Sequence, residues 1–337
     1  MQAIEMADSS SAADEPSTSD LVNRRIWQRA NSLKLYRLLE GFIDPGERAG
    51  FARVRGDARR GAVLDIGVGG GRTAAILLAE TQSYLGVDYT PAMIDICRAK
   101  FPQARFEVAD ARDLSRFSDG EFSLVVFSYN GIDSVGEADR RLVLAEVRRV
   151  LAPGGAYFFS SFNRLGPGFG HRRLTIRHID ASHGARAFVW SFVKYAAGSM
   201  IGLWHRLVMR RFDTSAKGGK LRLHPAHDYG ILVHTTTIAE LQEELAAAGF
   251  ARAPEIFGSS GRRVSLTGEA PDEEYFHVIA RKAGHQWMAS PRRGTSWPGL
   301  SRPVSRHRRG GTASWPEQVR PRRASYQRYQ RSRRRVR

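Results

Sequence analysis

The most constraining feature of this sequence is a strand-like run that ends in an acid and turns into a helix through closely spaced glycines. The run is Val63-Leu-Asp-Ile-Gly-Val-Gly-Gly-Gly-Arg-Thr73, with Asp65 at the strand end and glycines at positions 67, 69 and 71. Glycine lets the backbone turn sharply and approach a ligand without a Cβ clash. Free N–H groups at the start of the following helix favour an anionic or carboxylate group. The run therefore predicts a small-molecule site at the end of this strand.

Strand and helix patterns alternate on both sides of this loop, which indicates a parallel sheet with helices on both faces. Thr90-Pro91 is typical of a helix start, and Thr237 to Glu240 has the spacing of a capping box. Helical patterns fill the gaps between five β-rich runs: Ala62–Ile66, Ser83–Val87, Ala104–Val108, Phe122–Tyr129 and Ala156–Phe162. Two last runs, 251–257 and 275–281, have no helix between them, so we expect an antiparallel pair.

A second acid restricts the class of ligand that this site can bind. Asp88 ends the next strand, 21 residues after Gly67, where a carboxylate can accept hydrogen bonds from ribose hydroxyls. The dinucleotide fingerprint requires glycine at position 72, but this chain has arginine there. Asp65, two residues before the first glycine, suits a ligand with a positive ammonium group better than a pyrophosphate. The pattern therefore favours S-adenosylmethionine over a nicotinamide dinucleotide.

Five motifs in order then carry a family resemblance. They are the glycine loop, Leu85-Gly-Val-Asp88, Val108-Ala-Asp-Ala111, Phe122-Ser-Leu-Val-Val-Phe-Ser128 and Arg149-Val-Leu-Ala-Pro-Gly-Gly155. With the closing run Tyr275–Lys282, the sequence over roughly residues 30–282 resembles the class I S-adenosylmethionine-dependent methyltransferases. The resemblance implies a Rossmann-like, doubly wound α/β fold in three α/β/α layers. Its sheet would have seven strands, mostly parallel, with an antiparallel last strand.

The resemblance also implies where the cofactor binds. Asp65 and the glycines at 67, 69 and 71 (Gly67, Gly69 and Gly71) would hold the methionine part. Asp88 would bind the ribose hydroxyls, with Tyr89 beside the adenine. Tyr89 has the alternative of simply covering the sheet edge.

Three further residues complete the implied cofactor site. Asp110 would accept a hydrogen bond from the adenine amine, and the backbone N–H of Ala111 would face a ring nitrogen. Ser128, at the end of the fourth strand, would line the cleft near the transferable methyl group. Asp110 has the alternative of capping a turn.

The implied reaction is transfer of a methyl group to a small-molecule acceptor by in-line SN2 displacement, with the nucleophile held at about 3–3.5 Å. A hydroxyl acceptor would need a general base. Candidate catalytic residues are Asn130 and Asp133, directly after the fourth strand, and His227, in a cluster with His224, Asp228 and His234. Instead of a catalytic role, Asp133 could cap the helix that follows it, and His227 could be a solvated histidine in a loop. No metal-ligand spacing is present.

The insertion at 163–223 is expected to cover the acceptor site. Within it, Ala187–Trp204 holds one charge, Lys194, and five aromatic residues lie in and beside it. That composition suits a lipophilic or aromatic acceptor. A lid or dimer-forming helix is the favoured interpretation, and contact with a membrane surface is the alternative. A membrane span is excluded, because strands of one sheet lie both before and after this segment.

Charge divides the chain into three parts. Residues 1–20 hold five acids and no base, and 283–337 hold 15 arginines and one acid, so we expect a disordered leader and a disordered tail around a methyltransferase domain at 21–282. The tail is interpreted as a solvated extension, with a nucleic-acid or membrane tether as the alternative. The single cysteine, with no signal-peptide pattern, predicts a cytoplasmic protein. The alternative function is a non-catalytic protein that retains the cofactor pocket and binds nucleic acid or membrane.

Overall fold

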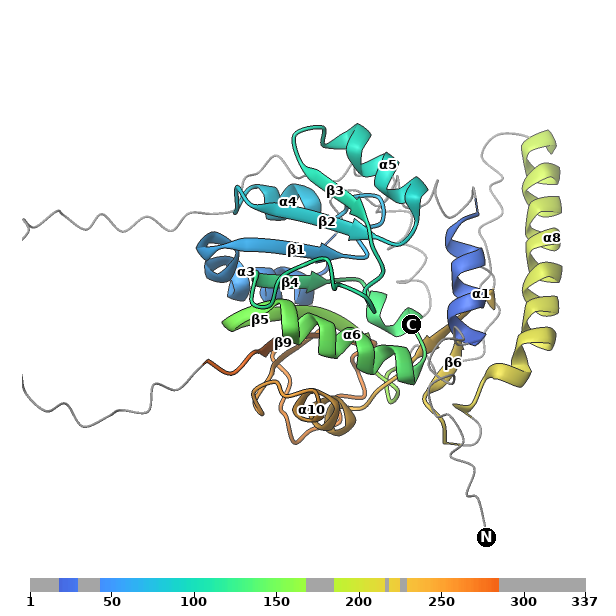
Figure 1. The fold of residues 1–337 in the computed structure, drawn as a ribbon. Coiled ribbons are helices and arrows are strands. Elements are labelled where there is room, and N and C mark those ends of the chain that lie inside the picture. Colours follow the sequence, from blue (N-terminus) through green and yellow to red (C-terminus); the bar gives the residue numbers. More distant parts are fainter. Residues whose placement is uncertain (1–17, 30–42, 168–184, 216–217, 225–228, 285–337) are drawn as a thin grey trace, which may run out of the picture. The chain divides into compact units, whose positions relative to one another are not determined.

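A seven-stranded sheet forms the centre of the fold (Figure 1). The computed structural model describes residues 18–29, 43–167, 185–215, 218–224 and 229–284. The strand order is β3-β2-β1-β4-β5-β9-β8. The strands are β1 (Ala62–Ile66), β2 (Tyr84–Asp88), β3 (Arg105–Val108), β4 (Phe122–Phe127), β5 (Leu151–Phe162), β8 (Glu255–Gly258) and β9 (Tyr275–Arg281).

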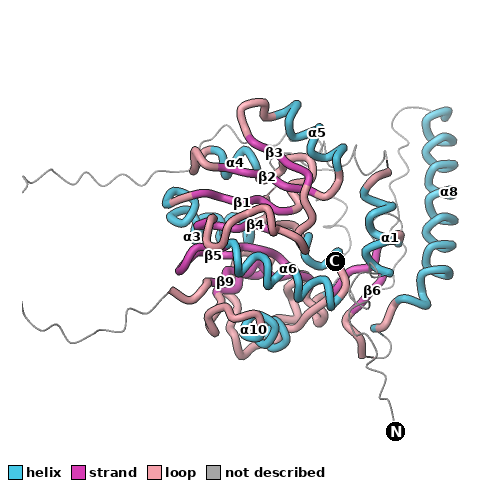
Figure 2. Tube along the Cα trace, viewed as in Figure 1, coloured by secondary structure: helices cyan, strands magenta, loops and turns pink. Residues whose placement is uncertain are grey.

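Seven longer helices and two short 3-10 turns accompany the sheet in the described residues (Figure 2). They are α1 (Thr18–Trp27), α3 (Pro45–Arg60), α4 (Ala74–Leu78), α5 (Pro91–Lys100), α6 (Glu137–Val150), α8 (Ala185–Met209), α10 (Ile238–Ala247), η1 (Gly131–Ser134) and η2 (Arg210–Phe212). The expected helix starts are confirmed at Pro91 and at Thr237, which forms a capping box with Glu240.

The order of strands in the sheet changes direction between β1 and β4. The chain adds β2 and β3 on one side of β1, and then returns to add β4 on the other side. β1 pairs in parallel with both β2 and β4, so Asp65 lies opposite Gly86 on one side and Val126 on the other. Ligands of open α/β sheets bind beyond the carboxyl ends of the strands at such a switch point. β9 is antiparallel to both of its neighbours, β5 and β8. The expected seven-stranded, mostly parallel sheet with an antiparallel last strand is therefore confirmed.

Alternating side chains of β5 show how the two faces of the sheet are covered. The ring of Phe158 packs edge-on against Phe51 of α3, with the ring centroids 4.9 Å apart. Its neighbours Tyr157 and Phe159 belong to a core cluster that includes buried residues of α6 and α10. Successive strand residues point to opposite faces. Helices therefore pack on both faces, as the three-layer expectation requires.

The structure corrects the sequence-based expectation in two connections. Residues 109–121, between β3 and β4, form turns rather than the expected helix (Figure 2). Asp, Ser and Gly, which favour turns, dominate this segment, while Leu114 and Phe117 still bury their side chains in the core. After α6, the chain enters β5 directly at Leu151, so Pro153-Gly154-Gly155 lies inside a strand and does not end the helix.

Two accessory elements were not anticipated. A two-stranded antiparallel sheet joins β6 (Leu221–His224) to β7 (Ile231–His234). Helix α1 packs against β7, where the side chain of Asn23 exchanges hydrogen bonds with the backbone of Leu232. Thr18 to Asp20 begin α1, which corrects the expected leader boundary, and residues 1–17 lie outside the described residues. Asp20 is buried because it pairs with Arg24 and Arg112.

Within the described part of the chain, no helix has the length and apolar character needed to cross a membrane. The expected disordered arginine-rich tail, residues 283–337, lies outside the described residues except for Ala283 and Gly284.

A buried ion pair fastens α6 to the sheet. Arg140 and Asp133 are both fully buried, and their Nη1 and Oδ1 atoms are 2.6 Å apart. Asp133 also accepts hydrogen bonds from the Ser161 hydroxyl at 2.7 Å and the Phe162 N–H at 2.6 Å. The Arg140 Nε pairs with Glu244 of α10. Burial raises the pKa of Asp133 to about 6, although Arg140 opposes this rise. The pair therefore connects η1, α6, β5 and α10.

We predict that Arg140→Ala lowers the free energy of unfolding by about 3–5 kcal/mol, because it leaves the Asp133 carboxylate buried without its cation. Chemical denaturation followed by circular dichroism measures this change. Arg141→Ala, at the neighbouring exposed position of the same helix, is the matched control and should leave stability unchanged. Equal effects of the two substitutions would contradict the assignment.

Candidate active site

A pocket lies beyond the carboxyl ends of β1, β2 and β4. Its walls combine the glycine loop, the residues after β2 and β3, the residues after β4, and one side chain of α1. The lining residues are Trp27, Ile66, Gly67, Gly69, Asp88, Tyr89, Thr90, Met93, Ala109, Ala111, Phe127, Ser128, Tyr129, Gly131 and Ser134. Six of the nine expected cofactor-binding residues thus share one pocket: Gly67, Gly69, Asp88, Tyr89, Ala111 and Ser128.

The glycine loop needs glycine for two separate reasons. Gly67 and Gly71 have φ angles of +61° and +80°, in the left-handed region that disfavours side chains. A Cβ on Gly67 would also lie 2.6 Å from the ring of Phe127, which lines the pocket. The loop therefore passes the end of β4 at a distance that only glycine permits.

Asp65 lies under the loop and is not among the pocket-lining residues. Its side chain is buried, and its Oδ2 accepts hydrogen bonds from the Thr73 hydroxyl at 2.6 Å and the Tyr84 hydroxyl at 2.9 Å. Burial raises the pKa of Asp65 to about 6, while these hydrogen bonds oppose the rise. In this arrangement Asp65 ties the end of β1 to the start of α4.

Asp88 connects the loop to the end of β2. Its Oδ2 accepts from the Gly69 N–H at 3.0 Å, and its Oδ1 accepts from the Thr90 N–H at 2.8 Å. Burial raises the pKa of Asp88 above its usual value. Each carboxylate oxygen has a second lone pair. Asp88 can therefore still accept hydrogen bonds from two adjacent hydroxyls of a ligand.

Arginines surround the third expected acid. Asp110 forms ion pairs with Arg24 of α1 and with Arg112, and is not among the pocket-lining residues. Burial opposes ionisation of Asp110, but hydrogen bonds from Arg112 and Arg24 outweigh it and lower its pKa to about 2. The guanidinium of Arg24 also lies 4.5 Å from the centroid of the Tyr89 ring. Helix α1 thus meets the expected adenine side of the site through one arginine.

A buried ion pair that the sequence did not reveal supports the pocket wall. The guanidinium of Arg72 donates two hydrogen bonds to Glu47 of α3, at 2.6 and 2.7 Å, and one to the Ser128 hydroxyl at 2.9 Å. The Ser128 hydroxyl in turn donates to Glu47. The Arg72 guanidinium also lies 4.9 Å from the centroid of the Tyr129 ring. This network fixes Ser128 where it lines the pocket.

The backbone just after β4 is strained. Tyr129 and Asn130 both adopt left-handed conformations, with φ of 57° and 58°. Such residues cluster at functional sites, because surrounding structure must hold them in place. The Asn130 N–H donates to the Ser160 hydroxyl at 2.7 Å, while the buried Asn130 Oδ1 has no hydrogen-bond partner in the described structure. Asn130 lies between Tyr129 and Gly131, which both line the pocket.

The other expected catalytic residues lie elsewhere. Asp133 is fully buried in its ion pair with Arg140 and is not among the pocket-lining residues, so the geometry favours a structural role over the expected catalytic one. His227 and Asp228 lie outside the described residues. His234 is buried, and burial together with nearby Arg140 lowers its pKa to about 2, so it is neutral at physiological pH.

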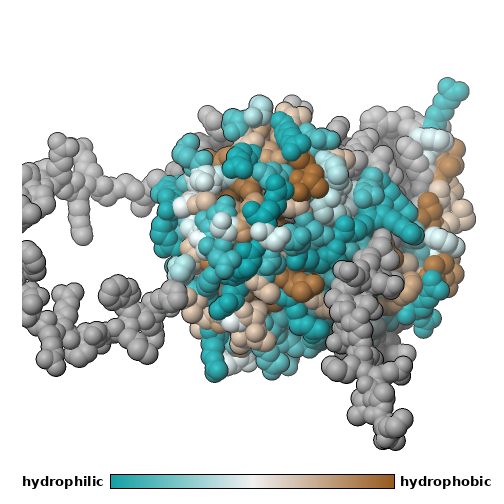
Figure 3. Space-filling model, in the orientation of Figure 1, coloured by the Kyte–Doolittle hydropathy of each residue, from teal (hydrophilic) through white to brown (hydrophobic). Residues whose placement is uncertain are grey.

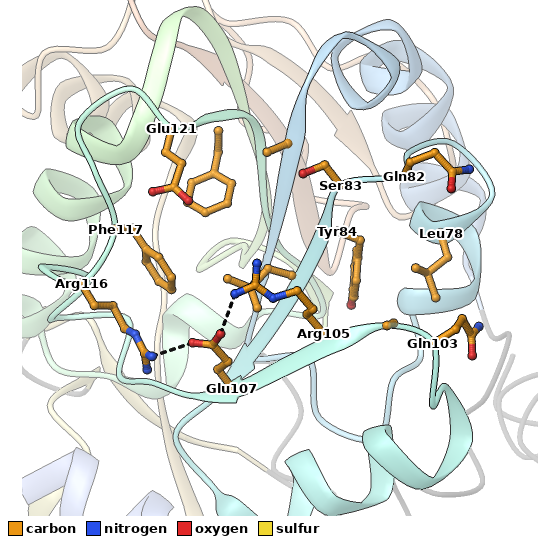
Figure 4. A pocket seen from close by; sticks show the side chains of 14 residues that line it. Leu78, Gln82, Ser83, Tyr84, Gln103, Arg105, Glu107, Arg116, Phe117 and Glu121 are labelled. Carbon is orange, nitrogen blue, oxygen red and sulfur yellow. Dashed lines mark hydrogen bonds and ion pairs between the residues drawn. The ribbon is translucent and has the colours of Figure 1, made fainter.

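A larger cavity elsewhere is a weaker candidate for the active site (Figure 4). It holds about 490 Å³ and is lined by the first residues of β1 to β4, including Tyr84, Arg105 and Phe122. Glu107 faces it between two arginines, with which it forms ion pairs. This cavity lies at the amino ends of the strands, opposite to where ligands of such sheets bind.

Among the described residues, no group of three or more His, Cys, Asp or Glu side chains could hold a metal ion. Cys97 is a buried free thiol, and burial raises its pKa to about 12.

A family model described as a methyltransferase domain matches residues 63–155, from β1 into β5. This span contains the glycine loop, Asp88, Ala111 and Ser128. Residues 63–155 are therefore similar to a methyltransferase domain. With the observed sheet, the match confirms the expected class I S-adenosylmethionine-dependent methyltransferase resemblance.

Curated relatives match part of this chain over part of their own length. The chain is 34% identical over 138 residues to the ubiquinone/menaquinone biosynthesis C-methyltransferase of Geobacter sp. strain M21, covering 38% of this chain and 57% of that protein. It is 33% identical over 104 residues to the demethylmenaquinone methyltransferase of Clavibacter sepedonicus, covering 30% and 41%. The chain therefore spans about half the length of the curated relatives it matches.

Solved structures of similar proteins are more distant. A 1,6-didemethyltoxoflavin-N1-methyltransferase from Burkholderia thailandensis has a TM-score of 0.47 and 17% identity, covering 79% of this chain and 88% of that one. An S-adenosylmethionine-dependent methyltransferase from Methanosarcina mazei has a TM-score of 0.43 and 20% identity, covering 66% and 92%. We therefore assign the fold from the strand order of this chain, and not from its similarity to these structures.

We predict that Gly67→Ala lowers the free energy of unfolding by about 1–3 kcal/mol and displaces the Phe127 ring into the pocket, because the new methyl group meets both the left-handed backbone and that ring. Gly56→Ala is the matched control. Gly56 is exposed within α3 and has open space around its Cβ position, so alanine there should raise stability by up to about 1 kcal/mol. Denaturation curves for both variants measure the contrast, and a neutral Gly67→Ala would refute the close approach.

Proposed function

We propose that this chain is an S-adenosylmethionine-dependent methyltransferase that acts on a small-molecule acceptor of lipophilic or aromatic character. The observation that carries the proposal is the single pocket that joins Gly67, Gly69 and Asp88 at the carboxyl ends of the strands. When bound, the cofactor supplies an activated methyl group for in-line SN2 displacement by a nucleophile held about 3–3.5 Å away.

The residues present fit the cofactor at three points. The buried carboxylate of Asp88 has lone pairs left for ribose hydroxyls. The glycine loop passes close to the ring of Phe127, which lines the pocket, because Gly67 carries no Cβ. Met93 and Ala109 give apolar walls beside Ala111, whose backbone N–H is the proposed contact for a ring nitrogen of adenine.

Two of the expected contacts take a modified form in this proposal. Asp65 acts on the methionine part through the loop it anchors, since Thr73 and Tyr84 occupy its Oδ2. Asp110 acts by holding Arg24 and Arg112 at the adenine side of the site, since four hydrogen bonds from these two residues occupy both of its oxygens. Gly71 contributes the turn between β1 and α4.

The acceptor side of the proposal rests on aromatic and apolar residues next to the pocket. Trp27 lines the pocket and also packs against an apolar cluster of Ile26, Phe162, Ile231 and Val233. Tyr129 lines the pocket and is partly exposed. One relative is a ubiquinone/menaquinone biosynthesis C-methyltransferase and another is a demethylmenaquinone methyltransferase, and both support a lipophilic acceptor.

Two residues remain as candidates for acceptor contact. Asn130 is not among the pocket-lining residues, but its neighbours Tyr129 and Gly131 are, and its buried Oδ1 without a hydrogen-bond partner is our candidate acceptor of a hydrogen bond from the methyl acceptor. His227 remains a candidate general base, and Asp133 is assigned to the scaffold. A cytoplasmic location is part of the proposal. It is supported by Cys97, a buried cysteine that forms no disulfide.

We predict that Asp88→Asn weakens binding of S-adenosylhomocysteine by about 10- to 100-fold, because the amide carries one acceptor oxygen where the carboxylate carries two. Isothermal titration calorimetry measures this loss. Asp95→Asn, at an exposed position on α5, is the matched control and should bind as the wild type does. Absence of binding heat with the wild-type protein would overturn the cofactor assignment itself.

We also predict that a chain ending at residue 282 transfers methyl groups as fast as the full chain, because the cofactor pocket lies wholly within residues 27–134. The assay uses methyl-labelled S-adenosylmethionine and a panel of quinols, phenols and aromatic amines, which separates carbon, oxygen and nitrogen acceptors. Transfer lost on truncation would favour the tail-dependent alternative. Cofactor binding with no transfer to any member of the panel would favour a non-catalytic protein.

A further inference from the structure

Helix α8 exposes an unusually long apolar surface. The large apolar residues exposed on it are Val189, Trp190, Phe192, Val193, Met200, Ile201, Leu203, Trp204, Leu207 and Val208. The exposed fractions of Met200, Trp204 and Leu207 are 69%, 60% and 68%. Figure 3 shows brown, hydrophobic residues along this helix. Exposed apolar surface of this extent on a protein marks an interaction site.

These side chains gather on one side of the helix. At about 100° per residue, Val189, Val193, Met200, Trp204 and Leu207 lie within roughly 60° of one another on the helical wheel. Gly202, His205 and Met209 lie on the other side and are buried. The described exposed apolar residues thus form a stripe on one side of α8, from Val189 to Val208.

The charge of this segment has a single sign. From Ala185 to Phe212 the sequence contains Arg186, Lys194, Arg206, Arg210 and Arg211 and no acid. Arg186 is exposed near the start of the stripe, and Arg210 and Arg211 are exposed beyond its end. A basic helix with Trp and Leu on its apolar face is typical of helices that lie in a membrane interface.

We propose that α8 binds the surface of an anionic lipid bilayer, with its apolar stripe among the acyl chains and its arginines at the lipid phosphates. Arginine and lysine side chains near such a surface are attracted by its negative potential. Trp204, with an apolar ring and a polar N–H, suits the boundary between headgroups and acyl chains.

The topology requires that α8 lie on the bilayer rather than cross it. β5 precedes α8 in the chain and β8 and β9 follow it, and all three strands belong to one sheet. Both ends of the helix therefore return to the same side of any bilayer. A second copy of the chain is a poorer occupant, because pairing α8 with α8 would bring two basic helices together without an acid on either.

The test measures co-sedimentation of the full chain with vesicles at 0.1 M and 0.5 M NaCl. One vesicle set is pure phosphatidylcholine, and the other contains 30% phosphatidylglycerol. High salt screens charge contacts made by the arginine-rich tail, whereas insertion of apolar side chains persists. We expect the wild type to remain on the anionic vesicles at 0.5 M NaCl.

Variants of α8 identify the face that binds. The triple variant Met200→Ser, Trp204→Ser, Leu207→Ser should lose at least tenfold in vesicle partitioning at 0.5 M NaCl. Leu142→Ser, at an exposed leucine of α6, is the control and should bind as the wild type does.

Three outcomes would overturn the proposal. They are no binding of the wild type to anionic vesicles, equal binding of the triple variant and the wild type, and a change in oligomer mass of the triple variant with unchanged vesicle binding, which would assign the stripe to a second copy. Light scattering measures the oligomer mass. Calorimetry with S-adenosylhomocysteine checks that each variant is folded, and this readout keeps a failure of the membrane proposal distinct from a failure of the proposed function.

Discussion

The buried ion pair between Arg72 and Glu47 is the interaction on which the geometry of the pocket depends. It joins the glycine loop to α3, and through Ser128 it joins both to the end of β4. Removing two charges from water costs more than their attraction returns unless hydrogen bonds satisfy the remaining groups. Here the two hydrogen bonds to Glu47 and the third to Ser128 meet that condition.

This ion pair also explains why the loop departs from the dinucleotide pattern. That pattern places glycine at position 72 so that helix and strand can pack closely. In this chain Arg72 reaches away from the loop to the buried Glu47, and the ring of Tyr129 lies beside its guanidinium. The residue that argued against a dinucleotide in the sequence thus has a structural partner that the sequence alone does not reveal.

The sequence predicted best those features that depend on neighbours along the chain. β1, β2 and β4, helix α5 and the capping box at Thr237 follow from local periodicity and from residues three or four positions apart. Helix α1 could not be predicted in this way, because its contact from Asn23 to Leu232 spans 209 residues. The β6–β7 pair was not predicted for a different reason: its strands have only four residues each, so their periodic pattern is weak.

The candidate site also divides into features that follow from the local sequence and features that depend on distant contacts. The pocket residues at the ends of β1, β2 and β4 follow from the rule that parallel strands bring their carboxyl ends to one edge. The role of Asp133 does not, because it depends on a buried partner. One signal in the sequence was available: Arg140 occupies the same helix face as Val143, Val147 and Val150, which are all buried. An arginine on an apolar stripe requires a buried acid, and Asp133 supplies it.

The acceptor must be sought outside the part of the chain that the family shares. The family match ends at Gly155 within β5, so it covers the glycine loop and Asp88 but neither α1 nor the β6–β7 pair. Trp27 nevertheless lines the pocket and packs with residues of β7. In the proposed function, these accessory elements therefore contribute to the choice of acceptor through Trp27 and the residues that pack against it. Likeness in the shared segment therefore supports the cofactor more strongly than it supports any acceptor.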